Sequence, residues 1–288
     1  MTRVGRITYI NCYPVYGAID RGIIQLNNAE LVNGVPTALN REMAAGTLDV
    51  SVISAVEYAR DATKYLLLPD LSICSDGPVR SVVLFSKRPA SELQGRRVLV
   101  SRSSMTSVAL LELLFENVWD AKPAFIPSNA ELTDVARFNE EEHDARLVIG
   151  DAALHLWSRL REPELYPETE TISQYRYAYD LGAEWKNWTG LPFVFAVWVA
   201  QRTSPVAECL GVQADLIASR NWGLEHLDAL AAQAAIATGV HKHVCLEYLS
   251  GLDYGLSYNH LAGLTEFFRR LVATGKVPNG SLAFLPAA

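Results

Sequence analysis

Residues 101–107 carry five hydroxyl side chains within seven positions. The segment follows a short apolar run typical of a strand and opens a strongly apolar run typical of a helix. The first turn of a helix offers free N–H groups and the positive end of the helix dipole, which together suit a carboxylate or a phosphate. Helix capping would account for one of these hydroxyls. We therefore predict an anion-binding segment that includes Ser103, Ser104, Thr106 and Ser107.

Two single polar residues, Asn11 and Ser81, stand in otherwise apolar surroundings. Asn11 ends the first expected strand, where ligands of open α/β sheets lie, although an Asn that serves only a turn is the alternative. Cys12 has no neighbouring His or Lys to activate it, so we expect a buried, unreactive thiol. Side chains alternate along a strand, so Ser81 and Arg80 should face opposite ways. We expect Ser81 to face the ligand.

Two strand ends supply further candidates. Ser54 closes the run 49–54, and Gly150 and Asp151 stand at an expected strand–helix junction. Polar groups at strand ends are expected to face a cleft. Asp151 has an equally good explanation as a helix N-cap.

The segment 184–193 combines aromatic and polar groups. Trp185, Trp188, Thr189 and Gly190 would suit the wall of a pocket for a small unsaturated ligand. The two indoles have an alternative role as packing residues whose N–H groups find partners.

Composition narrows the class of protein. The 288 residues carry a formal net charge of −7, half of them are apolar, and no Lys/Arg-rich run is present, so we expect no nucleic-acid partner. No P-loop, GxGxxG, HExxH or GxSxG motif occurs, and nothing calls for a nucleotide or a metal.

The longest apolar run, residues 191–200, is about half of a bilayer span, and the run after Arg6 is too short for a signal peptide. Four dispersed cysteines favour free thiols. We expect a cytoplasmic protein without a membrane partner.

Strand-like and helix-like runs alternate, which indicates α/β layers with mainly parallel sheets. A polar, Pro-bearing break at residues 87–89 interrupts the pattern, and an apolar run near 191–199 precedes a helical tail. We predict two lobes, one built from residues 1–87 and 195–288 and the other from residues 88–194. The chain would cross between them near 86–90 and 192–197. A single doubly wound domain is the alternative. The tail helices are expected at residues 205–220, 224–238, 243–250 and 260–274.

Eight segments, each weak alone, form a specific combination in their order. They are RITYINCYP (6–14), GVPTALN (34–40), GTLDVSVISAVEYA (46–59), LPDLSI (68–73), VRSVVL (79–84), LVIGDAAL (147–154), DLGAEW (180–185) and TGLPFVFAVW (189–198). In this order they resemble the chorismate dehydratase family of the futalosine-dependent menaquinone pathway. The resemblance runs from the N-terminus to about residue 200, and the helical tail agrees loosely.

The resemblance implies an α/β fold of the type-II periplasmic-binding-protein kind, with a ligand cleft between two lobes and two hinge crossings. It also implies that chorismate, a dicarboxylate, loses water to give 3-[(1-carboxyvinyl)oxy]benzoate without a cofactor. The family's polar pocket positions, an Asn after the first strand and a Ser in the strand before the first crossing, fall on Asn11 and Ser81, and we expect both residues to be catalytic. Paired serines are expected where this chain has Ser54 and Ala55, which leaves a role for position 55 in doubt.

Two other functions remain open at this level. The related dihydroxynaphthoate synthase of the same route has a similar fold, but its short Cys-Pro-Asn segment and an isolated, catalytic-looking His are not found here. A non-catalytic protein that binds or senses a small carboxylate would show much the same pattern. Turnover distinguishes an enzyme, which consumes many equivalents of its ligand, from a binding protein, which binds the ligand stoichiometrically and leaves it unchanged.

Overall fold

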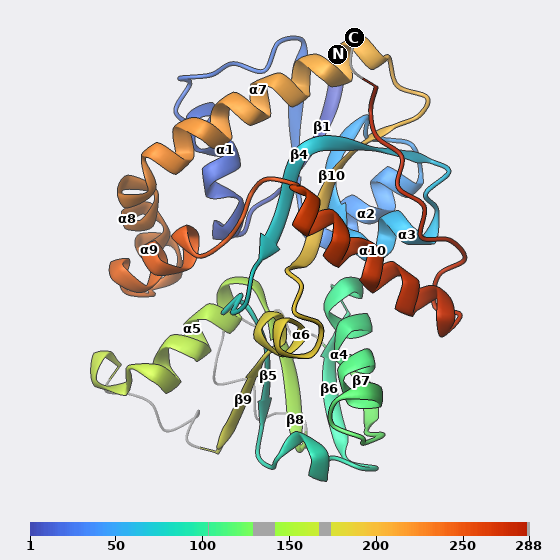
Figure 1. Cartoon of the computed structure of the whole chain (residues 1–288). Coiled ribbons are helices and arrows are strands. Elements are labelled where there is room, and N and C mark those ends of the chain that lie inside the picture. The colour runs from blue at the N-terminus through green and yellow to red at the C-terminus, as the bar shows by residue number, and fades with distance from the viewer. Residues whose placement is uncertain (103, 129–141, 167–173, 287–288) are drawn as a thin grey trace.

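Two five-stranded sheets form the centres of two lobes in the computed structural model, which describes residues 1–102, 104–128, 142–166 and 174–286 (Figure 1). The first sheet has the order β2 (Ala29–Gly34), β1 (Thr2–Ile7), β3 (Val50–Ser54), β10 (Phe193–Gln201) and β4 (Tyr65–Ser75). The second has the order β7 (Ala124–Ser128), β6 (Arg97–Ser101), β8 (Ala145–Ile149), β5 (Val82–Ser86) and β9 (Tyr177–Asp180). The predicted two-lobed α/β fold is confirmed.

The expectation of mainly parallel sheets holds for strand direction, since four of the five strands in each sheet run the same way, but each sheet also contains one antiparallel strand. β1 is parallel to β2 and β3, whereas β10 runs antiparallel to β3 and β4. The second sheet repeats this arrangement, with β6 parallel to β7 and β8, and β5 antiparallel to β8 and β9. In each sheet the antiparallel strand, β5 or β10, is the one that the chain enters directly from the other lobe, and this entry reverses its direction.

Helices cover both sheets. The first lobe carries α1 (Tyr13–Asp20), α2 (Pro36–Ala44), α3 (Ala55–Arg60), α7 (Val206–Glu225), α8 (Leu227–Thr238), α9 (Lys242–Ser250) and α10 (Tyr258–Ala273). The second carries α4 (Met105–Asn117), α5 (Gly150–Arg161) and α6 (Leu181–Thr189). A short 3-10 turn, η1 (Ile10–Cys12), follows β1 in the first lobe, and η2 (Ala90–Glu92) and η4 (Pro163–Leu165) lie in the second. The four predicted tail helices correspond to α7–α10. No helix among the described residues has the length and apolarity needed to cross a membrane.

The chain crosses between the sheets earlier than predicted. The first crossing joins β4, which ends at Ser75, to β5, which begins at Val82, and the second joins α6 to β10 across residues 190–192. The predicted boundary at residue 87 therefore assigns β5 to the wrong lobe. The turn that matters is at residues 76–81, where Gly77 and Arg80 have positive φ values. The Pro-bearing break at 87–89 only ends β5.

Asp180 ties the first crossing to the start of α6. It ends β9 and caps α6, accepting the backbone N–H groups of Gly182 and Ala183 at 3.0 and 3.1 Å. The same carboxylate accepts the N–H groups of Val79 and Arg80 at 3.0 and 2.6 Å. One buried side chain thus holds the two residues before Ser81 against the start of a helix.

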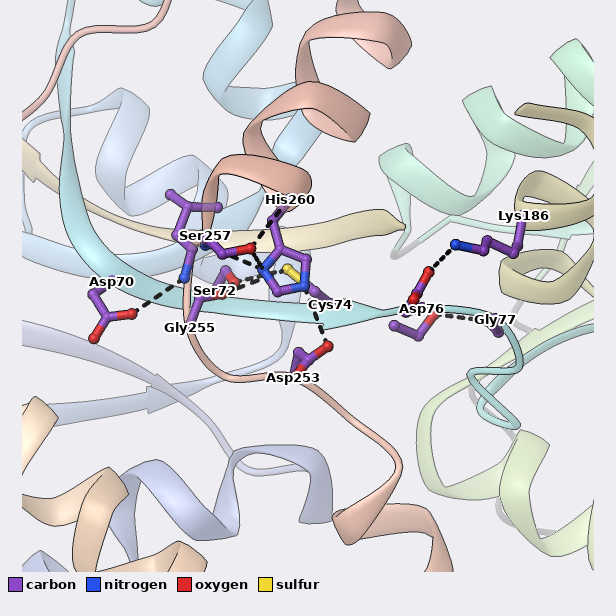
Figure 2. A network of polar contacts seen from close by, with 12 residues as sticks. Asp70, Ser72, Cys74, Asp76, Gly77, Lys186, Asp253, Gly255, Ser257 and His260 are labelled. Atoms are coloured by element: carbon purple, nitrogen blue, oxygen red, sulfur yellow. Dashed lines mark hydrogen bonds and ion pairs between the residues drawn. The ribbon is translucent and has the colours of Figure 1, made fainter. Parts of the chain in front are cut away.

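A polar network fixes the segment after α9 to β4 (Figure 2). Cys74 and Asp253 exchange backbone hydrogen bonds, both of 2.9 Å. The Asp253 carboxylate reaches the Nε2 atom of His260 at 3.2 Å, and His260 forms a capping box with Ser257 at the start of α10. Lys186 and Asp76 form an ion pair across the crossings at 2.5 Å. These contacts fix the segment between α9 and α10 to the end of β4.

Candidate active site

A cavity of about 80 Å³ lies where the two lobes meet. The first lobe and the crossings contribute the ends of strands β1 and β3, and the second contributes the starts of helices α4 and α5. The lining residues are Ile7, Tyr9, Asn11, Pro36, Ser54, Ile73, Val79, Ser81, Val82, Ser104, Thr106, Ser107, Ile149, Gly150, Phe195 and Ala196. None of the described side chains in this lining carries a charge, and most of its walls are apolar. The predicted residues Asn11, Ser54, Ser81, Ser104, Thr106, Ser107 and Gly150 are brought together here.

Helix N-termini converge on the cavity. Pro36 is the first residue of α2, Ser104 caps α4, and Gly150 is the first residue of α5. Because the positive end of a helix dipole lies at each such terminus, the cavity favours an anion without any cationic side chain in its described lining. It is suited to a ligand that carries a negatively charged group on an otherwise apolar body.

Two cavity hydroxyls are held as acceptors by donors of the protein. Ser54 Oγ accepts the backbone N–H of Glu57 at 3.2 Å and the Asn40 amide at 3.3 Å. Thr106 Oγ1 accepts the backbone N–H of Val56 from the opposite lobe at 3.1 Å. A backbone N–H can only donate, so the proton of each hydroxyl is left for another acceptor. Both side chains therefore offer donors to a ligand.

Ser104 and Ser107 form a linked pair at the start of α4. Ser104 Oγ accepts the N–H of Ser107 at 3.3 Å and donates to Ser107 Oγ at 2.6 Å. Capping thus uses Ser104, while the Ser107 hydroxyl keeps its own proton. Ser103, also predicted to bind the ligand, lies outside the described residues.

Asn11 occupies the 3-10 turn η1 directly after β1. Its Oδ1 atom is buried and finds no hydrogen-bond partner among the residues that the structure describes. Buried polar atoms are nearly always paired in native proteins, so an unpaired one in a cavity points to a ligand. The adjacent Cys12 is buried, and desolvation raises the pKa of its thiol to about 12, as expected of an unreactive cysteine.

Ser81 is held at several points. Tyr248 of α9 donates its hydroxyl proton to Ser81 Oγ at 2.8 Å, and the Ser81 carbonyl accepts the N–H of Gly150 at 2.8 Å. Gly150 has φ +65°, and a Cβ atom there would lie 3.1 Å from the ring of Tyr9, so a larger residue would be strained. Arg80 does not line the cavity and pairs with Glu247 at 3.5 Å.

Asp151 lies beside the cavity lining and is not the N-cap of α5. The N-cap of α5 is Ile149, and the Asp151 carboxylate instead accepts the backbone N–H of Ile10, one residue before Asn11, at 3.2 Å. Local sequence could not predict this contact, because it joins residues 141 positions apart. Burial raises the pKa of Asp151 to about 6.

We expect Asp151→Asn to change the pH dependence of stability. The folded carboxyl keeps its proton up to about pH 6, whereas the ordinary value is 3.8, so its stabilising contribution is complete below pH 3.8 and is lost as the pH rises through 6. Asn cannot ionise and can still accept from Ile10. From pH 4 to pH 8 the free energy of unfolding of the variant should therefore rise relative to the original protein by about 1–3 kcal/mol. Urea unfolding at both pH values measures this, and a difference independent of pH would contradict it.

Trp185, Thr189 and Gly190, which were predicted to bind the ligand, do not line the described cavity. The Trp185 indole is fully buried against Phe193 and Phe267 and donates to the carbonyl of Pro192 at 3.2 Å. Thr189 donates to the Trp185 carbonyl and Gly190 ends α6 in the left-handed conformation. The packing alternative thus holds for Trp185, because the helix that carries it turns its indole into the core beside the second crossing.

Sequence reasoning named seven of the sixteen lining residues and missed nine, among them Tyr9, Pro36 and Phe195. It also missed Tyr248 behind Ser81. Tyr9, Pro36 and Phe195 fall within the segments 6–14, 34–40 and 189–198, which the resemblance had singled out. Tyr248 has no such signal, since in sequence it is one apolar position of a helix. Among the described residues no group of three or more His, Cys, Asp or Glu side chains is placed to hold a metal ion.

Solved structures with similar folds include a protein of Archaeoglobus fulgidus, AF1704. Its TM-score is 0.71 at 20% sequence identity, with 96% of this chain and 98% of that chain covered. The periplasmic aliphatic sulphonate binding protein SsuA of Escherichia coli has a TM-score of 0.62 at 13% identity, with 100% of this chain and 94% of that chain covered. At these identities the similarity shows the fold, which is that of periplasmic binding proteins.

Sequence comparison adds the family. The profile of a family described as "Menaquinone biosynthesis" matches residues 2–273. A chorismate dehydratase of Thermus thermophilus is 33% identical over 272 residues, which cover 93% of this chain and 94% of the relative. A chorismate dehydratase of Campylobacter jejuni is 29% identical over 195 residues, or 67% of this chain and 64% of the relative. The chain that builds this uncharged, donor-lined cavity therefore belongs to the menaquinone biosynthesis family.

Proposed function

We propose that this chain is a chorismate dehydratase, which converts chorismate into 3-[(1-carboxyvinyl)oxy]benzoate and water. The activity named for both relatives supports this. The observation that carries the proposal is the cavity itself, where helix N-termini and hydroxyl donors surround a space without charged side chains among its described lining. Such a site attracts a dicarboxylate while its apolar walls accept the carbon ring.

One carboxylate of chorismate would lie at the N-terminus of α4. Thr106 and Ser107 reach the cavity from the first turn of that helix, and each retains a hydroxyl proton to donate. Hydrogen bonds to a charged acceptor are shorter and stronger than those between neutral groups. This contact would orient the ring toward Asn11 and Ser81.

The reaction removes the proton from the ring carbon that carries the enol ether and expels the neighbouring hydroxyl as water. Formation of the aromatic ring makes the sum favourable. A general base must come within hydrogen-bond reach of that proton. The described cavity lining holds amide and hydroxyl groups but no carboxylate or imidazole, and Asp151 is engaged by Ile10.

The base is therefore assigned to the substrate. The enolpyruvyl arm of chorismate carries a carboxylate that is tethered close to the carbon that loses its proton, and tethering raises effective concentration greatly. Asn11 and Ser81 would hold the arm over the ring and stabilise the negative charge that develops. The protein's own contribution is then orientation and hydrogen-bond donation.

Multiple turnover of chorismate tests the proposal. The purified protein should consume many equivalents of chorismate and release an aromatic product, identified by NMR and mass spectrometry, while Asn11→Ala serves as the matched control. Stoichiometric binding of chorismate without consumption would identify a binding protein and contradict the proposal.

A cytoplasmic location forms part of the proposal. Cys12, Cys74, Cys209 and Cys245 are all buried and unpaired. Free thiols persist in a reducing compartment, and this supports the location.

A further inference from the structure

Tyr248 makes a buried hydrogen bond to a residue of the cavity. Its side chain is 1% exposed and that of Ser81 is 3% exposed, and their oxygen atoms are 2.8 Å apart. Tyr248 lies on α9, 167 residues after Ser81 in the sequence. The segment that follows α9 is bound to β4 by the network around Asp253 (Figure 2). The contact is therefore built by the fold and not by local sequence.

The direction of this bond decides what Ser81 can do. A phenol is a stronger acid than an aliphatic alcohol, and its oxygen is the poorer acceptor, so Tyr248 donates and Ser81 Oγ accepts. Burial raises the pKa of Tyr248 far above its ordinary value, which keeps the phenol protonated and hence a donor at every working pH. With its oxygen already accepting, the hydroxyl proton of Ser81 points elsewhere.

The cavity is the direction that remains for the Ser81 hydroxyl proton. The Ser81 N–H donates to the Val79 carbonyl at 2.8 Å, and the Ser81 carbonyl accepts from Gly150. The backbone is therefore fixed on both sides of the side chain, while Ser81 itself lines the cavity. When the oxygen of a hydroxyl accepts a hydrogen bond, the hydroxyl also becomes a stronger donor.

We propose that Tyr248 is a positioning residue, which orients the Ser81 hydroxyl so that its proton is donated into the cavity, to the oxygen of the substrate that gains negative charge. The inference rests on the proposed dehydratase function for its kinetic consequence. Tyr248 itself does not line the cavity and acts only through Ser81.

Kinetics of a double-mutant cycle test this role. Ser81→Ala should lower kcat about 100-fold, as loss of a preorganised donor does. Tyr248→Phe keeps the ring and should lower kcat about tenfold with KM changed by less than about twofold, because the donor remains but loses its orientation. In the double variant the Tyr248 change should have no further effect, since its partner is gone. Tyr254→Phe, which removes another buried hydroxyl that bonds only the Leu249 carbonyl at 3.4 Å, is the matched control and should retain the original kcat. Unchanged kcat in Tyr248→Phe, or additive losses in the double variant, would overturn the proposal.

Neutron diffraction from crystals of the unaltered protein, exchanged into heavy water, provides a readout that needs neither folding of a variant nor turnover. The Tyr248 deuterium should point at Ser81 Oγ and the Ser81 deuterium into the cavity. The opposite orientation, with Ser81 donating to Tyr248, would overturn the inference. If the protein does not consume chorismate, the proposed function fails, whereas this measurement still decides the role of Tyr248.

Discussion

Replacing Asn11 by Ala is expected to lower kcat for chorismate about 100- to 1000-fold, the usual effect of removing one preorganised donor from a site where charge develops. The donor is the NH2 group of the Asn11 amide, which lies at the cavity. The Oδ1 atom, buried and unpaired among the described residues, can only accept and would meet a donor of the substrate such as its hydroxyl. The Asn11 amide contributes its hydrogen-bond energy only when it meets its partner, which on our account is the reacting part of the substrate. Binding of chorismate should change far less than kcat.

Single-turnover kinetics and calorimetric binding separate these two effects. Asn117→Ala removes an amide from the opposite end of α4, where it bonds the Leu113 carbonyl at 2.8 Å, and should leave both quantities unchanged. An Asn11→Ala variant that loses binding and turnover to the same extent would show that Asn11 serves ground-state binding alone.

The second large effect is expected at the start of α4. Thr106→Val and Ser107→Ala should each weaken chorismate binding about ten- to hundredfold, because a hydrogen bond to a charged group contributes about 1.5–3 kcal/mol. Thr106→Val also leaves the N–H of Val56 without its acceptor, which weakens the contact between the lobes. Thr106→Ser keeps the hydroxyl and is the control that should bind normally. If both hydroxyls can be removed without a change in the dissociation constant, the carboxylate is held elsewhere.

Local sequence patterns predicted many of the residues of the candidate site. Runs of hydroxyls before an apolar helix and single polar residues at strand ends are short-range patterns, and they placed Asn11, Ser54, Ser81, Ser104 and Thr106 at one cavity. The physics behind them is local, since strands deliver their last residues to one edge and helices deliver their first N–H groups to the same edge.

Long-range contacts account for what the sequence could not provide. Asp151 looked like a cap or a ligand, yet it bonds Ile10, and Tyr248 looked like helix core, yet it orients Ser81. Trp185 shows the opposite error, because an aromatic residue beside a turn suits a pocket wall and a core equally well. No local pattern distinguishes these cases.

The first crossing was misplaced for a similar reason. The break after Ser86 has the stronger composition signal, whereas the actual passage at residues 76–81 is defined by Asp180, which is about a hundred positions away in the sequence and holds Val79 and Arg80 in place. Strand pairing, and not the break, decides that β5 belongs to the second sheet.

Turnover of chorismate by the Asp151→Asn variant tests the central claim, that the protein orients the substrate and the substrate supplies the base. Asp151 is the carboxylate beside the described cavity lining, and the rise of its pKa to about 6 would suit a general base. Our account predicts that the variant keeps kcat within about tenfold of the original protein, since Asn still accepts from Ile10 and only this positioning contact is weakened. A variant that binds chorismate normally but loses essentially all turnover would show that the protein supplies the base and would contradict the account.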